Sequence, residues 1–196
     1  MNICLFCGTF NPIHNAHLRA AEYVSDTFGY GKIIFIPTNN APHKEVLGCQ
    51  PENRLEMVKL AIAGNKKFEV SDIEFQRNER SYTYDTIVRL NKMYGNQEKW
   101  PFIIGTDAFC QVKSWYRSSD LKNLLKFIVL TRDNKPSRRL IEYIAADGYD
   151  VEFTNLSFCD ISSTGIRKKV ECGEDISEFV PPEVENYIYE HGLYKN

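Results

Sequence analysis

Residues 3–17 have the sequence Ile-Cys-Leu-Phe-Cys-Gly-Thr-Phe-Asn-Pro-Ile-His-Asn-Ala-His. This pattern predicts an apolar strand over residues 3–7, followed by a loop, Gly8–His17, that opens a helix. Backbone N–H groups at a helix start lack partners and meet the positive end of the helix dipole, which suits phosphate. His14 and His17 are spaced to lie on one face of the first turn, and histidine can donate charge-assisted hydrogen bonds near neutral pH. The segment favours phosphoryl or nucleotidyl transfer, and two ordinary helix-surface histidines are the alternative.

Strand-like and helix-like segments alternate along the rest of the chain. Strands are expected at residues 3–7, 33–36, 68–70, 102–104, 127–130 and, as an edge strand, 151–153. Helices are expected at residues 13–28, 51–64, from 81, around 107–115, around 140–144, at 162–173 and from 181 or 182. This order predicts an α/β fold with a doubly wound, mainly parallel sheet flanked by helices. We expect residues 1–196 to form a single domain, with C-terminal helices over about 162–196 packed on its core.

Local signals add detail to the expected helices. Leu55, Val58 and Ile62 have the spacing of a buried stripe on the helix that begins at Pro51. Ser81 and Ser162 are expected to cap the helices that follow them, because a serine side chain can accept a hydrogen bond from a first-turn amide.

Composition and charge exclude several classes of protein. The hydrophobic fraction of 43%, the charged fraction of 26% and the net charge of −2 are typical of a globular protein without a broad basic surface. We therefore expect no nucleic-acid partner and no anionic membrane partner. No apolar run approaches the ~20 residues of a membrane span, and the first residues lack a basic signal-peptide region, so a cytoplasmic location is expected.

Six cysteines raise the question of a redox or zinc site, because Cys4 and Cys7 form a C-x-x-C pattern. Residues three apart in a strand point to opposite faces of the sheet, and no second pair completes a zinc site. We expect buried, reduced thiols at these two positions and at the other four, Cys49, Cys110, Cys159 and Cys172.

A second helix start suited to phosphate lies near the C-terminus. Three hydroxyls, from Ser162, Ser163 and Thr164, stand at the expected helix start, and Arg167 follows one turn later. Hydroxyls and first-turn amides can hold phosphate oxygens, while a guanidinium offers a planar fork of donors. A plain serine cap beside a surface arginine is the alternative. A dinucleotide-binding dehydrogenase would need G-x-G-x-x-G, and here Gly8 stands alone until Gly29.

The run Gly8–His14 with His17, together with Ile161–Thr164 and Ile166-Arg167, resembles the bacterial nicotinate-nucleotide adenylyltransferases, nucleotidyltransferases with HxxH and ISSTxIR motifs. Further matching pieces are Pro42-His43-Lys44, Glu52 with Arg54 and Met57, Ser81–Thr86, Gly105 with Asp107, Trp115-Tyr116 and Val184–Tyr194. The resemblance covers nearly the full chain and implies a Rossmann-like fold. It also implies an enzyme of NAD biosynthesis that joins ATP to nicotinate mononucleotide by direct in-line attack, releasing pyrophosphate.

The resemblance implies roles for individual residues. The catalytic groups would be His14, His17 and Arg167. ATP would contact Gly8, Thr9, Phe10, His17, Asp107, Ile161, Ser162, Ser163, Thr164 and Arg167, with Asp107 on a ribose and Mg²⁺ arriving with ATP rather than at a protein site. The mononucleotide would contact Asn39, His43, Lys44, Thr83, Trp115 and Tyr116. In this arrangement Trp115 stacks on the pyridine ring, and backbone amides near Thr83 and Tyr116 receive its carboxylate.

Several alternatives stay open at this point. The chain could be another adenylyltransferase, acting on nicotinamide mononucleotide or phosphopantetheine, or an inactive nucleotide-binding regulator. Lys44 could be a solvated lysine, Asp107 a helix cap and Trp115 a packing residue. Cys7 and Asn11 depart from the usual Gly-Gly-Thr-Phe-Asp-Pro pattern of the family; Asn11 can still cap a helix but supplies no charge. The sequence leaves a homo-oligomer open.

Overall fold

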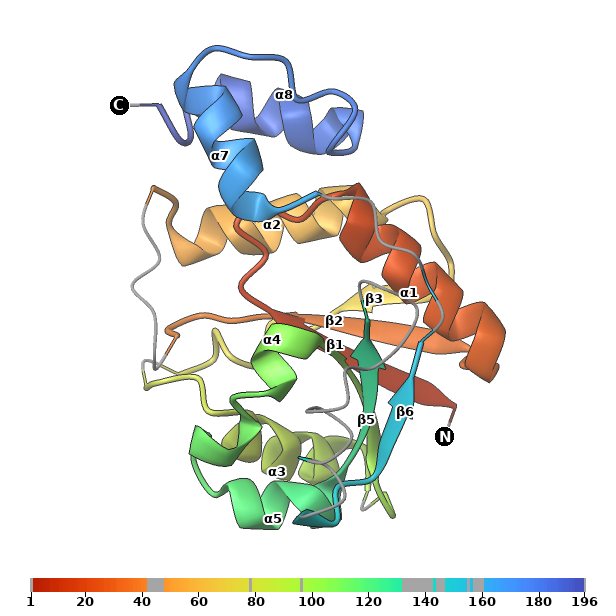
Figure 1. Cartoon of the computed structure of the whole chain (residues 1–196). Helices are drawn as coiled ribbons and strands as arrows, with labels where there is room; N and C mark the ends of the chain where they lie inside the picture. The colour runs from red at the N-terminus through yellow and green to blue at the C-terminus, as the bar shows by residue number, and fades with distance from the viewer. Residues whose placement is uncertain are drawn as a thin grey trace.

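The fold is built on a parallel sheet of six strands in the order β3-β2-β1-β4-β5-β6 (Figure 1). The computed structural model describes residues 2–41, 48–77, 79–95, 97–131, 143, 147–154, 156 and 161–195. The strands are β1 (Ile3–Gly8), β2 (Lys32–Pro37), β3 (Phe68–Val70), β4 (Trp100–Gly105), β5 (Leu125–Leu130) and β6 (Val151–Phe153). All five strand pairs are parallel, and β6 is an edge strand as expected. The order reverses between β1 and β4, which confirms the doubly wound, Rossmann-like fold and marks its switch point.

Helices cover both faces of this sheet, as Figure 1 shows. They are α1 (Asn15–Phe28), α2 (Pro51–Ile62), α3 (Thr83–Tyr94), α4 (Thr106–Phe109), α5 (Ser118–Leu124), α7 (Ser163–Glu171) and α8 (Pro182–Glu190), with a 3₁₀ turn, η1 (Val112–Ser114). The short helix α5 was not expected from the sequence, and the helix expected around 140–144 falls almost entirely outside the described residues. Among those residues, no helix combines the length and apolarity needed to cross a bilayer.

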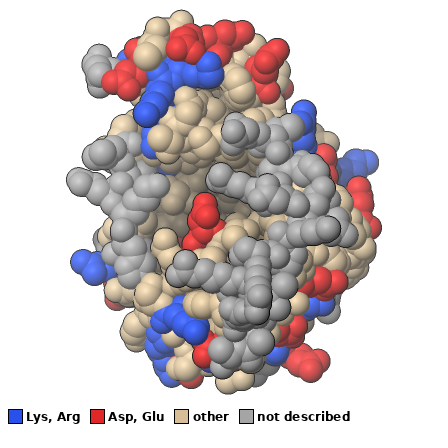
Figure 2. Space-filling model, viewed as in Figure 1, with Lys and Arg blue, Asp and Glu red and all other residues tan. Residues whose placement is uncertain are grey.

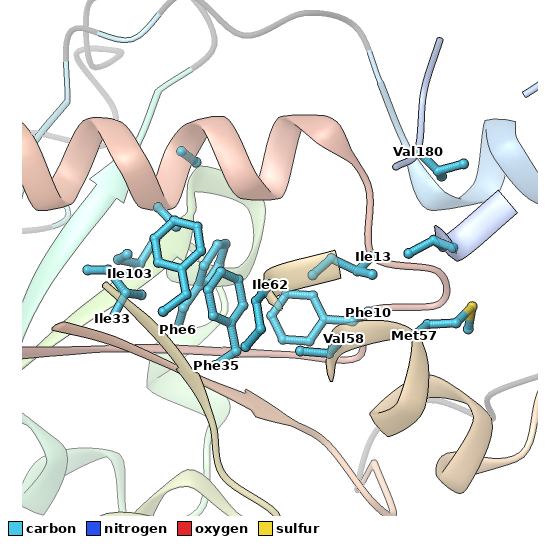
Figure 3. Close-up of a cluster of buried hydrophobic side chains, with 14 of the residues drawn as sticks. Phe6, Phe10, Ile13, Ile33, Phe35, Met57, Val58, Ile62, Ile103 and Val180 are labelled. Carbon is cyan, nitrogen blue, oxygen red and sulfur yellow. The ribbon is translucent and has the colours of Figure 1, made fainter. Parts of the chain in front are cut away.

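The core on one face of the sheet joins the strands to α1, α2 and the C-terminal helices. Side chains alternate along β1, so Cys4 and Phe6 face this core while Leu5 and Cys7 face the other. Phe6, Phe10 and Phe35 form its aromatic centre, beside Val58 of α2 (Figure 3). Buried residues of α7 and α8 belong to the same cluster, namely Ile166, Val170, Val184 and Ile188. The C-terminal helices therefore share a core with the sheet.

The opposite face is covered by α3, α4 and α5. Its cluster unites strand residues such as Leu5 and Phe102 with Leu90 of α3, Phe109 of α4 and Leu121 of α5. Because apolar side chains are buried on both faces, the central strands carry continuous apolar runs. The two cysteines of the C-x-x-C pattern lie on different faces, as predicted.

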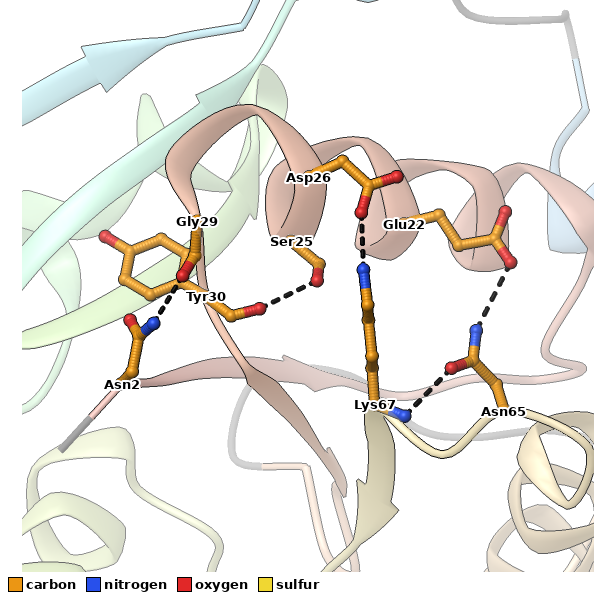
Figure 4. A network of polar contacts seen from close by, with 8 residues as sticks. All are labelled: Asn2, Glu22, Ser25, Asp26, Gly29, Tyr30, Asn65 and Lys67. Atoms are coloured by element: carbon orange, nitrogen blue, oxygen red, sulfur yellow. Dashed lines mark hydrogen bonds and ion pairs between the residues drawn. The ribbon is translucent and has the colours of Figure 1, made fainter.

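Polar contacts fix the C-terminal end of α1 at the edge where the strands begin (Figure 4). Gly29, at φ 72°, ends the helix in the left-handed conformation, and Ser25 Oγ donates to the carbonyl of Tyr30 at 2.7 Å. Lys67 Nζ pairs with Asp26 at 2.6 Å. These contacts hold one end of α1, while its other end points to the carboxyl edge of the sheet, where the candidate site lies.

The structure corrects several local expectations. Helix α3 begins at Thr83 with Tyr82 in the cap position, while Ser81 Oγ instead accepts the N–H of Asn40 at 3.2 Å. On α2, Leu55 is only half-buried. The buried face of this helix is turned toward the side that carries Arg54 and Met57.

The described cysteines are unpaired, as expected, but not all of them are buried. The five described cysteines, Cys4, Cys7, Cys49, Cys110 and Cys172, are free thiols. Cys4 is buried, and Cys7 and Cys49 are partly exposed where they pack against the two cores. Cys110 and Cys172 belong to neither core and are exposed. Cys159 lies outside the described residues.

Candidate active site

A cavity of about 330 Å³ opens at the carboxyl ends of β1, β2 and β4, next to the switch point of the sheet. Its lining comes from the end of β1, the segments after β2 and β3, the start of α3, β4 and the turn before α5. The lining residues include Gly8, Thr9, Thr38, Glu74, Thr83, Gly105, Trp115 and Tyr116. Figure 2 shows that the molecule is hollowed below the C-terminal helices, with an acidic group in the hollow and basic side chains on those helices. Ligands of open α/β sheets bind at such a position.

The loop after β1 is shaped by a close approach between Gly8 and Phe10. A Cβ on Gly8 would come within 3.0 Å of the Phe10 ring. Phe10 itself has φ 46° and is 3% exposed, because its ring turns back into the core. Gly8 is therefore required by packing as well as by any ligand that approaches its backbone.

The two histidines lie together at the start of α1. Their rings stack with centroids 3.6 Å apart and an interplanar angle of 21°. His14 occupies the cap position, and its N–H donates to Nδ1 of His17 at 3.2 Å. Since Nδ1 of His17 accepts, its neutral ring carries the proton on Nε2. The expected placement of both rings on one face of the first turn is correct, and His17 keeps one N–H donor for a ligand.

Burial sets the charge of this pair. It lowers the pKa of His14 to about 4. Burial, and then the neighbouring His14, lower the pKa of His17 well below its ordinary value. The lowered pKa values favour the neutral form of both rings in the free protein, so charge-assisted donation to a bound phosphate stays a prediction. An anion placed against them would raise both pKa values again, because a nearby negative charge favours the imidazolium form.

The C-terminal cluster meets this loop directly. Ser162 caps α7 as predicted, its Oγ accepting the N–H of Gly165 at 3.1 Å. Ser163 Oγ donates to the carbonyl of Pro12 at 2.9 Å, across 151 residues of chain. Arg167 Nη1 donates to the carbonyl of Asn11 at 2.7 Å, and its Nη2 to Thr164 Oγ1 at 3.2 Å. The two predicted halves of the phosphate site are thus joined, with Ser163 and Arg167 holding the loop between them.

Two further hydrogen bonds connect the same loop to the C-terminal part of the chain. Tyr194 donates its hydroxyl hydrogen to Oδ1 of Asn11 at 2.7 Å in a buried bond. The N–H of Asn15 donates to the carbonyl of Phe179 at 2.8 Å. Sequence reasoning placed Tyr194 in a matching segment without a role, because the contact spans almost the whole chain.

Three of the residues expected to bind the mononucleotide line the cavity together with Gly8 and Thr9, namely Thr83, Trp115 and Tyr116. Thr83 is the first residue of α3, so its amide belongs to a helix N-terminus. Trp115 is half-buried, with its ring edge toward Phe102 at a centroid distance of 6.3 Å. Tyr116 is 48% exposed and lies against the ring of Tyr82.

Other expected residues are placed differently. Asn39 is not among the cavity-lining residues, because its side-chain amide donates to the carbonyls of Glu74 and Arg77, at 3.4 and 3.2 Å. Asp107 is exposed on α4, whose cap residue is Gly105, so the alternative of a capping role is not realised. Of the residues expected to contact ATP, Gly8 and Thr9 line the cavity, whereas Phe10, His17, Asp107, Ile161, Ser162, Ser163, Thr164 and Arg167 do not, and neither does His14. His43 and Lys44 lie outside the described residues.

Two buried charged residues near the cavity were missed. Arg54 is 0% exposed and donates to the carbonyls of Thr9, Thr38 and Asn39, at 2.7, 2.6 and 3.0 Å. Glu74, 3% exposed, accepts from Thr86 Oγ1 at 2.8 Å, and burial raises its pKa. Arg54 lies in one of the sequence motifs on which the family resemblance rests. Its burial was not predicted, because an arginine on a helix is usually exposed.

The side chains that contact the loop before α1 include no metal-binding cluster among the residues that the structure describes. Within the described ranges, no group of three or more His, Cys, Asp or Glu side chains could hold a metal ion. The polar groups that face the loop from α7 are hydroxyls and a guanidinium, which suit phosphate oxygens rather than a cation.

The chain is similar to known proteins over its whole length. The model of the cytidylyltransferase-like family matches residues 5–169. A protein from Caldicellulosiruptor saccharolyticus named "Probable nicotinate-nucleotide adenylyltransferase" is 39% identical over 198 residues, covering 100% of both chains. A protein of the same name from Desulfitobacterium hafniense is 40% identical over 196 residues, covering 96% of this chain and 93% of its own length.

Solved structures show the same fold. Plasmodium falciparum nicotinic acid mononucleotide adenylyltransferase complexed with NaAD aligns with a TM-score of 0.82 and 22% identity, covering 98% of this chain and 96% of that chain. Its complex with APC aligns with a TM-score of 0.76, 21% identity and the same coverage. From the fold, the joined motifs and the identity of 39% over its full length, the chain belongs to the nicotinate-nucleotide adenylyltransferase family.

Proposed function

We propose that the protein transfers the AMP unit of ATP to nicotinate mononucleotide, forming nicotinate adenine dinucleotide and pyrophosphate. The observation that carries this proposal is one cavity whose wall includes both Gly8-Thr9, beside the histidine pair, and the group Thr83, Trp115 and Tyr116. A phosphate-suited loop and a pocket for a flat ring therefore adjoin each other, as a reaction between two nucleotides requires.

The reaction needs no covalent intermediate on the protein. A phosphate oxygen of the mononucleotide attacks the α-phosphorus of ATP, and the bond from that phosphorus to the bridging oxygen breaks as pyrophosphate leaves. The Nε2–H of His17 would donate to the phosphate oxygens as charge develops, supported by first-turn amides of α1 and α7. Mg²⁺ would enter bound to ATP and neutralise charge on the leaving pyrophosphate. Arg167 would act from the joined loop, where Asn11 already holds its guanidinium.

Substrate choice would lie on the other side of the cavity. The indole of Trp115 offers a flat apolar face for the pyridine ring. Amides at the start of α3 and near Tyr116 can donate to a carboxylate, whereas the NH₂ of a nicotinamide would leave such donors unpaired. We therefore expect nicotinate mononucleotide to be preferred over nicotinamide mononucleotide. A cytoplasmic location stays a prediction.

The direct test is pyrophosphate release with ATP, Mg²⁺ and each candidate acceptor. We expect kcat/KM to be highest with nicotinate mononucleotide, ahead of nicotinamide mononucleotide and phosphopantetheine. His17→Ala should lower kcat by about 10²–10³-fold, the typical loss for one transition-state donor. His191→Ala, which removes an exposed ring at the end of α8, is the matched control and should keep full turnover.

Two results would contradict the proposal. Full turnover of His17→Ala would remove the role given to that ring. Binding of ATP without pyrophosphate release, with every acceptor tested, would instead indicate a nucleotide-binding regulator.

A further inference from the structure

A buried cation lies one hydrogen bond behind the cavity wall. Arg54 of α2 is fully buried and donates to three backbone carbonyls, those of Thr9, Thr38 and Asn39. Thr9 and Thr38 both line the cavity. We propose that Arg54 is a positioning residue that fixes the two substrate loops relative to each other, an inference that rests on the transfer reaction proposed above.

The three carbonyls belong to two different loops. Thr9 follows β1 and leads to the histidine pair, whereas Thr38 and Asn39 follow β2. Within the part of the chain that the structure describes, a backbone hydrogen bond joins the two loops, from the N–H of Thr38 to the carbonyl of Gly8 at 2.9 Å. Arg54 Nη1 spans the same gap, because it donates at once to Thr9 and to Thr38, at 2.7 and 2.6 Å. One guanidinium nitrogen therefore sets the spacing of the two loops.

Asn39 extends this arrangement to the far wall. Its carbonyl accepts from Arg54 Nη2 at 3.0 Å, and its N–H donates to Oε2 of Glu74 at 3.4 Å. Glu74 lines the cavity and also accepts from Thr86 of α3. The chain of hydrogen bonds from α2 to α3 thus passes through Asn39 and Glu74, and the side-chain amide of Asn39 adds donors to the carbonyls of Glu74 and Arg77.

The chemistry of the side chain matches this task. An arginine presents several donors in a rigid plane and can serve three carbonyls, while a lysine offers a single ammonium. None of the ion pairs formed within the described ranges includes Arg54. Its hydrogen bonds all go to neutral carbonyls, and through Asn39 they lead to Glu74 in the cavity wall.

The test compares Arg54→Met and Arg54→Lys with Met57→Ala. Met57 is fully buried on the same helix, in the core cluster that also holds Phe10, so its truncation loosens the packing of α2 and leaves the hydrogen bonds from Arg54 to both loops in place. Each variant is first checked for a folded far-UV spectrum. Two readouts follow: kcat with KM for both substrates, and hydrogen exchange of the Thr38 amide relative to the Ile34 amide in the preceding strand β2.

The expected results separate positioning from simple stabilisation. Arg54→Met should lower kcat by about 100-fold, raise KM for both substrates and speed Thr38 exchange relative to Ile34, because small misplacements of reacting groups cost about that much. Arg54→Lys keeps the charge and part of the bonding, so it should lose about 10-fold in kcat with intermediate exchange. Met57→Ala should keep kcat and both KM values within about twofold, with an unchanged exchange ratio.

Several results would overturn the proposal. The first is a folded Arg54→Met variant whose kcat and KM values equal those of Met57→Ala. The second is a change in KM for only one substrate while Thr38 exchange stays unchanged. If Arg54→Met does not fold, wild-type kinetics and exchange in Arg54→Lys would overturn it equally. If the wild-type protein releases no pyrophosphate, the proposed function fails, while Thr38 exchange still decides whether Arg54 joins the loops.

Discussion

Acid should weaken the fold through His14, and His14→Asn should remove that part of the pH dependence. The ring of His14 is 5% exposed, and its pKa is about 4 in the folded protein against 6.5 ordinarily. Burial is the main cause, since it penalises the charged imidazolium. The pKa of His17 is lowered in the same direction, so its titration adds to the effect.

The sign and size follow from proton linkage. Above pH 6.5 the ring is neutral in both states, and its pKa shift has no effect on stability. As the pH falls from 6.5 toward 4, the unfolded chain binds a proton that the folded protein does not, so the free energy of unfolding decreases. Below about 4 both states are protonated and the loss levels off. The difference between 6.5 and about 4 corresponds to a loss of about 3 kcal/mol.

The assay is urea unfolding of both proteins at a series of pH values from about 8 to 4. Asparagine suits a helix cap and does not titrate, so His14→Asn keeps the start of α1. At pH 8 the difference between the two proteins measures lost packing alone and serves as the reference. Relative to that reference, the wild type should lose about 3 kcal/mol more than His14→Asn by pH 4. Parallel curves over this range would refute the buried, neutral state of the ring.

Two other substitutions probe the opposite ends of the site. Trp115→Leu should raise KM for nicotinate mononucleotide by about 10-fold, through loss of the aromatic face, and leave KM for ATP unchanged in steady-state assays. Equal effects on both substrates would argue against stacking. Tyr194→Phe removes the hydrogen bond to Asn11 and should lower the free energy of unfolding by about 1 kcal/mol in urea. A stability equal to the wild type would mean that the bond contributes nothing net.

The strands were predictable because burial on both faces leaves a direct trace in the sequence. A run such as Ile33–Ile36 is apolar throughout, since every side chain of β2 enters one core or the other. Helix α5 left no such trace, because its seven residues are too few to reveal a helical period. The prediction of a helix cap at Ser81 was wrong because its hydroxyl accepts a hydrogen bond from the N–H of Asn40, 41 residues away, and the sequence does not reveal such a distant contact.

The residues of the candidate site could be named from the sequence, whereas the contacts between them could not. Local chemistry was enough to single out His14, His17 and Arg167, because helix starts with donors suit phosphate. The neutral state of the histidines depends on burial, which the sequence does not state. The burial of Arg54 is a tertiary property too, because it follows from carbonyls on two distant loops.

The same connections explain how Asn11 can stand where the family usually has aspartate. Asn11 is 7% exposed, its Oδ1 accepts from the hydroxyl of Tyr194 and its carbonyl accepts from Arg167. Burial raises the pKa of Tyr194, so its hydroxyl remains a donor at neutral pH. Both bonds need an acceptor at residue 11 and neither needs a charge, whereas a buried carboxylate would carry a desolvation cost. The geometry of the loop, and with it the placement of His14 and His17, is therefore independent of negative charge at this position.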